Sequence, residues 1–164
     1  MVSLRKYKGT FEYLEDSNKE DNESNWVTVN SFFSYFVSSS QAFISQTVKS
    51  SPLAIGDDGF TDVVYMSEST GASKYRLAKL LINQDEGDYF KKDFELKDNG
   101  KLNDNIKKGL EPGQGIEYIK TKEYKLIPEN KEGFFSIDGE KYKSNGIHLK
   151  VKQQCLRVFG YKKQ

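Results

Sequence analysis

Apolar and polar residues alternate in short runs along most of the chain. The clearest alternation is in residues 147–152, where Ile147, Leu149 and Val151 are separated by His148 and two lysines, and this period of two predicts a strand. Residues 26–37 form the run richest in Val, Thr, Phe, Tyr and Trp, with apolar residues on both parities, so we expect a strand covered on both faces. Further strands are predicted over 4–14, where Gly9 leaves open one strand or two across a bend, and over 60–66, 116–127, 134–137 and 156–161.

Only one segment has the period of an amphipathic helix. In residues 73–85, Leu77, Leu80, Leu81 and Gln84 follow the i, i+3, i+4, i+7 spacing, and Gly87 is placed to end the helix. Many short strands with one helix predict a mainly β fold, namely an antiparallel β-sandwich with one packed α-helix.

Two polar stretches interrupt the pattern, at about 15–25 and 97–114. Neither has enough apolar residues to pack into a core, so we expect exposed loops or insertions. The whole chain, residues 1–164, is then a single β-rich lobe.

Composition excludes several functional classes. The 25 Lys and Arg residues nearly balance the 24 Asp and Glu residues, which argues against a nucleic-acid-binding protein. One Cys and one His exclude a disulfide framework and a multi-histidine metal site within the chain. The N-terminus has no apolar signal region, so we expect a reducing, cytoplasmic setting.

The segment Asp138-Gly139-Glu140 is the strongest candidate for chemistry. Its two carboxylates flank a glycine that lets a ligand approach the backbone, so Asp138 and Glu140 could hold Mg²⁺ or orient a nucleotide. The alternative is an ordinary Asp-Gly hairpin turn, which the local pattern alone favours. The other glycine-rich acidic segment, residues 56–59, precedes a strand rather than a helix and is interpreted as a surface turn.

Other side chains have both a structural and a functional interpretation. The stripe of Leu77, Leu80 and Leu81 is either core or one wall of an apolar lipid pocket. His148 is expected at the surface and Cys155 as a small buried residue. The lysines on or near strands predict a solvated face or protection of edge strands, or alternatively a weak attraction to anionic membranes; they are Lys6, Lys8, Lys120, Lys122, Lys125, Lys141, Lys143, Lys150 and Lys152.

In order, these segments resemble the C-terminal lobe of sphingosine kinases, in the diacylglycerol kinase-like lipid kinase superfamily. Residues 5–14 are similar to the family's R-x-Y-x-G-x-L-x-Y-L strand, and Trp26 with the aromatic run after it to its W-x-x-x-x-x-x-F block. The remaining similar segments are Pro52 with 59–66 (P…DG), 73–87 (S-R-x-x-L-L-x-L with a final glycine), 125–128 (R-L-x-P) and 136–140 (V-D-G-E).

The resemblance implies a function. Sphingosine kinases transfer the γ-phosphate of ATP, with Mg²⁺, to the primary hydroxyl of a sphingoid base, between an N-terminal nucleotide-binding lobe and this β-rich lobe. It implies that Asp138, Gly139 and Glu140 lie on the nucleotide side, and that Leu77, Leu80 and Leu81 line the lipid pocket. The implied partners are a sphingoid-base lipid, ATP and, transiently, the surface of a membrane.

The chain also departs from the family. It lacks the G-G-D-G-T type nucleotide loop and the early acidic residues of the C-terminal lobe, and it has Asp88 where relatives often have His. No catalytic residue is therefore assigned here, and the isolated chain is expected to be inactive. The alternatives are a non-catalytic β module that binds a lipid or protein partner, and an unrelated β-sandwich interaction domain.

Overall fold

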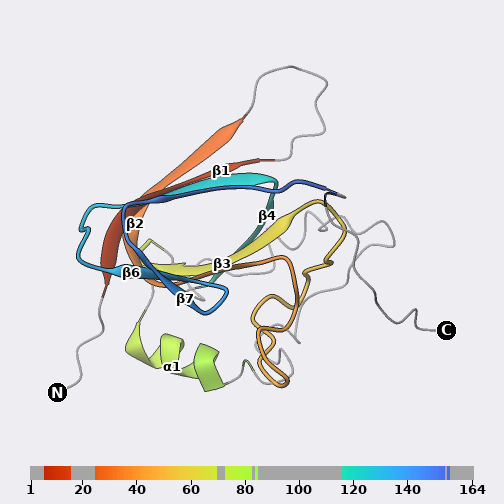
Figure 1. Cartoon of the computed structure of the whole chain (residues 1–164). Helices are drawn as coiled ribbons and strands as arrows, with labels where there is room; N and C mark the ends of the chain where they lie inside the picture. The colour runs from red at the N-terminus through yellow and green to blue at the C-terminus, as the bar shows by residue number, and fades with distance from the viewer. Residues whose placement is uncertain are drawn as a thin grey trace.

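The computed structural model describes residues 6–15, 25–69, 73–82, 84, 116–153 and 155. This part of the chain is mainly β, with antiparallel sheets and one short helix, α1 (Lys74–Ile82), as the pattern predicts. One sheet has six strands in the order β4-β3-β2-β1-β5-β8, and β6 and β7 form a separate hairpin (Figure 1). The strands are β1 (Tyr7–Leu14), β2 (Trp26–Ser39), β3 (Thr61–Ser67), β4 (Glu117–Thr121), β5 (Glu123–Pro128), β6 (Phe134–Ile137), β7 (Glu140–Lys143) and β8 (Ile147–Lys150).

Two stretches of chain pair with both β1 and β3. The first half of β2 pairs with β1, a bulge follows at Ser34, and the second half pairs with β3. In the same way β4 pairs with β3 and β5 pairs with β1, with only Lys122 between them. Because both stretches turn from one partner strand to the other, the sheet curls and its two halves face each other, as in sandwiches whose strands switch sheets at bulges and bends.

An aromatic cluster fills the space between the two halves. Phe11 of β1 is fully buried, and its ring centroid lies 5.1 Å from Phe36 of β2, 5.4 Å from Tyr65 of β3 and 5.9 Å from Tyr124 of β5. All three contacts are edge-to-face, the geometry that brings the positive edge of one ring to the negative face of another. Side chains from three other strands therefore contact the ring of Phe11.

The other face of β3 is covered as well. Every residue of β3 is buried, and Val64 forms a second cluster with Leu53 and Tyr118. The segment between β2 and β3 supplies Leu53, and α1 lies below β3 in Figure 1 with Leu80 as its buried residue. The continuous apolar run in β3 reflects this burial on two faces.

The structure corrects some boundaries and the predicted burial of Cys155. Residues 7–14 form one strand, so Gly9 does not mark a bend. The predicted strand 116–127 is divided at Lys122, and Cys155 is exposed rather than buried. The second polar stretch (97–114), most of the first (15–25), Gly87, Asp88 and residues 156–161 lie outside the described residues.

Gly9 is needed where β1 passes β5. A Cβ at this position would lie 2.8 Å from the carbonyl oxygen of Ile127 and 3.2 Å from Cα of Pro128, and both of these atoms belong to the backbone. Backbone cannot move aside as the end of a side chain can, so β1 and β5 would have to separate.

We therefore predict that Gly9→Ala lowers the free energy of unfolding by about 1–3 kcal/mol, the usual cost of overpacking. Gly56→Ala is the matched control, because the nearest atom to its Cβ is the Ser40 carbonyl oxygen at an ordinary 3.7 Å. Urea denaturation of both variants measures the difference. Equal stability of the two variants would show that the contact between β1 and β5 is not tight.

Candidate functional site

The segment Asp138-Gly139 is the two-residue turn of the β6–β7 hairpin. Both residues have positive φ, 51° for Asp138 and 87° for Gly139, and Ile137 pairs with Glu140 across the turn. Positive φ at both central residues is the type I′ geometry, which matches the twist of the flanking strands. The sequence Asp-Gly thus forms the hairpin turn that its pattern predicts, and this leaves the proposed role in nucleotide binding still to be tested.

The side chains of this turn take little part in the packing of the fold. Asp138, Gly139 and Glu140 are exposed, and a Cβ on Gly139 would meet no atom within 4 Å. Glu140 accepts a 2.9 Å hydrogen bond from the hydroxyl of Tyr142. That bond favours the neutral phenol and raises the pKa of Tyr142. The tip therefore presents two carboxylates and an accessible glycine backbone to solvent.

The two carboxylates at the tip of the hairpin can supply only some of the ligands that Mg²⁺ needs. Among the described residues no group of three or more His, Cys, Asp or Glu is arranged to hold a metal ion. Mg²⁺ bound with a nucleotide commonly takes one or two carboxylates and fills its other positions with phosphate oxygens and water. Asp138 and Glu140 could supply those carboxylates if a nucleotide brought the phosphates.

The three leucines of α1 lie in three different environments. Leu80 is 2% exposed, Leu77 is half-buried and Leu81 is 52% exposed. Leu80 and Leu81 both fall in the apolar stripe that the sequence predicts, but they lie 100° apart around the helix, and of the two the structure buries Leu80. Leu80 belongs to the interior of the lobe, whereas Leu81 presents an apolar side chain at its surface.

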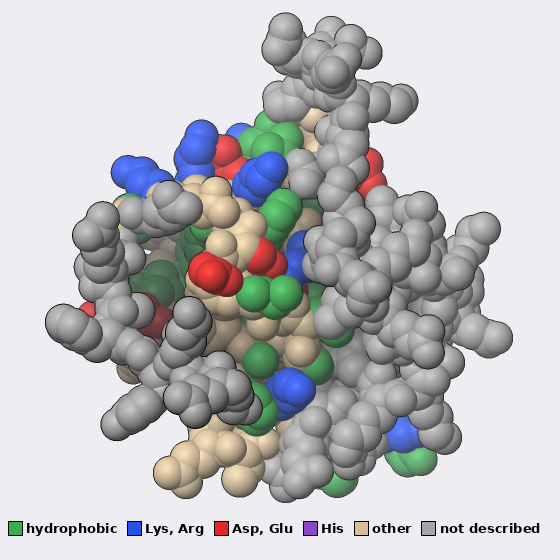
Figure 2. All heavy atoms as spheres, turned by 90° about the vertical axis from the view of Figure 1, so that its right-hand side faces the viewer, with side chains coloured by type: hydrophobic (Ala, Val, Ile, Leu, Met, Phe, Trp, Pro, Cys, Tyr) green, Lys and Arg blue, Asp and Glu red, His purple; other side chains and the backbone are tan. Residues whose placement is uncertain are grey.

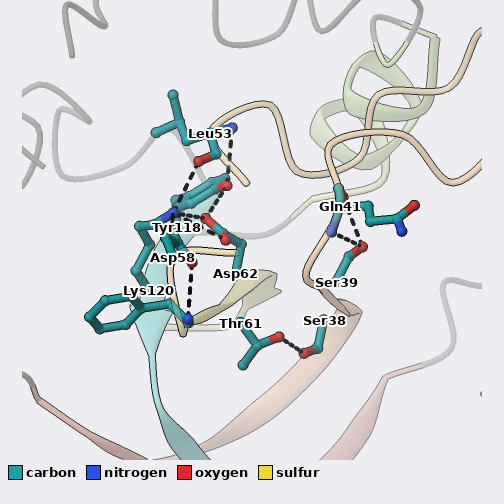
Figure 3. Close-up of polar contacts among 10 residues, drawn as sticks. Ser38, Ser39, Gln41, Leu53, Asp58, Thr61, Asp62, Tyr118 and Lys120 are labelled. Atoms are coloured by element: carbon teal, nitrogen blue, oxygen red, sulfur yellow. Dashed lines mark hydrogen bonds and ion pairs between the residues drawn. The ribbon is translucent and has the colours of Figure 1, made fainter. Parts of the chain in front are cut away.

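A cluster of charged side chains is buried between β3, β4 and the segment that precedes β3 (Figure 3). The ammonium of Lys120 donates to Asp58 at 2.6 Å and lies 3.3 Å from the carboxylate of Asp62. Tyr118 donates to Asp62 at 2.6 Å. Asp62 is completely buried and the side chain of Lys120 is 9% exposed, so water screens this ion pair little.

The same cluster forms hydrogen bonds with the backbone of Leu53. The amide of Leu53 donates to the hydroxyl of Tyr118 at 3.2 Å, and its carbonyl accepts from Lys120 at 3.0 Å. Tyr118 and Lys120, which lie two residues apart on β4, therefore bind the amide and the carbonyl of Leu53. Asp58 also accepts from the amide of Phe60 at 3.0 Å, which closes the turn before β3.

Burial and hydrogen bonding act in opposite directions on Asp62. Removal from water raises the pKa of its carboxyl, and the bonds from Tyr118 and Lys120 partly offset that rise. Two carboxylates share one ammonium, so loss of Lys120 would leave a buried carboxylate without a counter-charge. The arrangement fixes in place the loop that precedes β3.

Sequence reasoning missed this cluster. Lys120 was predicted on a solvated face, which is wrong, because its ammonium reaches under the segment that precedes β3. Asp62 lies in an otherwise mainly apolar run of β3. Because a buried carboxylate needs a partner, this position is the sequence signal for a buried cation or hydrogen-bond donor.

The remaining polar groups of interest lie at the surface. His148 is exposed as predicted, and its Nε2 lies 2.7 Å from Oε1 of Glu123. Lys150 is 3.1 Å from the other oxygen of that carboxylate, and bonds from both partners lower the pKa of Glu123. A groove of about 480 Å³ lies over β1 and β2, but its carboxylates at Glu68 and Glu129 are already paired with Lys6 and Lys8.

Comparison with known proteins adds no relative. No family model matches the chain, and no curated protein matches it. In the described part of the chain, no helix has the length and apolar character needed to cross a membrane.

We predict that Lys120→Met destabilises the chain by about 3–5 kcal/mol, because it leaves Asp62 charged and buried without its partner. Lys8→Met is the control, since Lys8 pairs with Glu129 where both side chains are more than half exposed, and its loss should cost about 1 kcal/mol or less. Chemical denaturation at neutral pH measures both. Similar losses in the two variants would mean that the buried cluster contributes no more than a surface pair.

Proposed function

We propose that the chain is the lipid-binding lobe of an ATP-dependent lipid kinase of the sphingosine kinase type, and that it completes the nucleotide cleft with its β6–β7 hairpin. In this proposal the fold is the β-sandwich of that kinase lobe. The reaction is transfer of the γ-phosphate of Mg²⁺-ATP to the primary hydroxyl of a sphingoid base. Residues outside this chain supply the phosphate-binding loop.

Several segments that carry the resemblance meet one another in the fold. The glycine of the first motif, Gly9, pairs with Pro128 of the Lys125–Pro128 motif, and only glycine fits at that contact. Gly59, the glycine of the P…DG segment, has a φ of 80°. Asp58, which precedes it, forms an ion pair with Lys120. These motif residues therefore have structural reasons to occur together, which supports the assignment to a shared fold.

The observation that carries the functional proposal is the exposed acidic tip of the hairpin. A type I′ turn needs positive φ at its two central residues, which Asp-Gly provides, but it places no such demand on Glu140, the first residue of β7. The contact that Glu140 makes is to an exposed neighbour two residues away. A carboxylate there is available to a nucleotide-bound cation.

The exposed leucine of α1 supports the lipid side of the proposal. Burial of a methylene group is worth about 0.8 kcal/mol, so an alkyl chain gains affinity from each apolar side chain it covers. Leu81 and the half-buried Leu77 offer such a surface beside the buried Leu80. The competing function, a non-catalytic module that binds a lipid, would use the same leucines but not Glu140.

The nucleotide role is tested by NMR on the ¹⁵N-labelled chain. We expect Mg²⁺-ATP to shift the amide resonance of Gly139, and expect Glu140→Gln to reduce that shift, because the variant keeps the shape and removes the charge. Gly146, an exposed turn glycine with φ of 112°, serves as the internal control. Glu132→Gln is the control variant, since Glu132 is an exposed carboxylate in another turn. Equal shifts at Gly139 and Gly146 would exclude a nucleotide site at the tip.

The lipid role is tested with leucine variants and a fluorescent sphingosine. Leu81→Ala should weaken binding roughly tenfold or more, since it removes about three apolar carbons from the contact, while changing the free energy of unfolding by less than about 0.5 kcal/mol. Leu80→Ala should instead cost about 2–5 kcal/mol of stability.

Fluorescence anisotropy measures lipid affinity in this test, and thermal denaturation measures stability. Ile127→Ala is the control, because Ile127 is 47% exposed on β5, away from α1. If Leu81→Ala binds the lipid as tightly as the unmodified chain does, α1 is not a wall of the lipid pocket.

A further inference from the structure

The groove over β1 and β2 contains an aromatic ring that the core does not use. Phe32 lines this groove of about 480 Å³, a size typical of small-molecule sites. It points to the opposite side of β2 from its buried neighbour Phe33, because successive side chains of a strand alternate between the two faces. Phe32 is 38% exposed, so its ring offers a flat apolar surface inside the groove.

Polar residues of the groove lie on three sides of Phe32. Lys8 is its partner across the β1–β2 ladder, and the carboxylate of Glu129 lies 2.8 Å from the Lys8 ammonium. On the other side of β2, the amide of Glu68 donates to the carbonyl of Phe32 at 2.9 Å. Asn30 is two residues away along β2, on the same face. A ligand that matches this lining has an apolar centre and polar groups around its edge.

Asn30 is oriented by its neighbour on β1. The oxygen of its side-chain amide accepts a 2.7 Å hydrogen bond from the hydroxyl of Thr10. The amide nitrogen carries two donor hydrogens, and Asn30 is exposed. The nitrogen can therefore donate to an oxygen atom of a ligand in the groove.

The charges that line the groove are balanced. Among the described lining residues the charged ones are Lys8, Glu68 and Glu129. Lys8 pairs with Glu129 at 2.8 Å, and Glu68 pairs with Lys6 at 3.0 Å. Figure 2 shows basic and acidic side chains side by side on one face of the molecule as well. A charged ligand would compete with one of these pairs, whereas a neutral ligand leaves both intact, so the lining favours a neutral ligand.

We propose that this groove binds a neutral pyranose sugar of the β-glucose type. Such a ring carries its hydroxyls around its edge and directs its axial C–H bonds to its two faces. The negative face of an aromatic ring attracts positively polarised hydrogens, so one face of the sugar lies on Phe32. The Lys8 ammonium is 6.0 Å from the ring centroid, beyond the roughly 4 Å of a stacked contact. The sugar hydroxyls then meet Asn30 and the two ion pairs, which supply both donors and acceptors.

This inference goes beyond the proposed kinase function. The groove uses neither the carboxylates of the β6–β7 hairpin nor the leucines of α1. Sphingosine binding and the amide shift of Gly139 therefore report on the kinase proposal separately from any result for the groove.

The test is an NMR titration of the full ¹⁵N-labelled chain with methyl β-glucopyranoside. We expect the amides of Ser31 and Phe32 to shift with the glucoside and not with sorbitol, an acyclic polyol that has hydroxyls but no ring face. Phe32→Leu keeps an apolar side chain and removes the flat ring, so it should weaken the association about two- to tenfold. Phe43→Leu is the matched control, because Phe43 is 48% exposed and does not line the groove, and this variant should retain binding.

A charged analogue tests the balance of charge. Methyl β-glucuronide keeps the ring and adds one carboxylate, so the unmodified chain should bind it more weakly than the glucoside at low salt. Glu129→Gln removes the partner of Lys8, and we expect this variant to bind the glucuronide more tightly than the unmodified chain does.

Each of the following results would overturn the proposal. Equal shifts with the glucoside and sorbitol, or no shift with either, would exclude a pyranose site. Equal affinities of Phe32→Leu and the unmodified chain would remove the ring from the contact, and equal losses in the two phenylalanine variants would place the contact elsewhere. Shifts of the same amides with uridine but not with the glucoside would assign the groove to a flat heterocycle instead.

Discussion

The fold depends on the burial of one phenylalanine between two halves of a single curled sheet. Phe11 contacts aromatic rings from three other strands: Tyr124 is on β5, which pairs directly with β1, whereas the curl of the sheet brings Phe36 and Tyr65 to Phe11. The bulge in β2 and the bend at Lys122 are the two places where a strand leaves β1 and continues on β3, or the reverse. Apolar burial supplies the driving force, while the close approach at Gly9 determines how near β1 and β5 can lie.

Both faces of β3 are buried. Its inner side meets the aromatic cluster, and its outer side meets Leu53, Tyr118 and the segment before β3. Asp62 on this strand must therefore be neutralised inside the protein, and Lys120 and Tyr118 from β4 do so while they hold Leu53. A buried ion pair adds little net stability over apolar packing, but it penalises alternative placements of the loop that would leave the charge unpaired.

The functional surfaces that we propose lie outside this packed centre. The acidic tip of the β6–β7 hairpin is exposed, while Phe135 of the same hairpin packs on the core, and α1 presents Leu81 at the surface. Because Glu140 and Leu81 are exposed, substitutions at either position are expected to change binding without disturbing the core. The proposed nucleotide and lipid roles can thus be examined one at a time.

The sequence alone determined the class of the fold and its local turns. Period-two alternation predicted the strands, period 3.6 the helix, and Asp-Gly the hairpin, because each depends on residues that are close along the chain. It could not show that β4 pairs with β3 while β5 pairs with β1, that Gly9 faces Ile127, or that Lys120 is buried against Asp58 and Asp62. It also could not separate Leu80 from Leu81, since both fall in one apolar stripe. These features depend on which distant segments meet, and only the curl of the sheet brings those segments together.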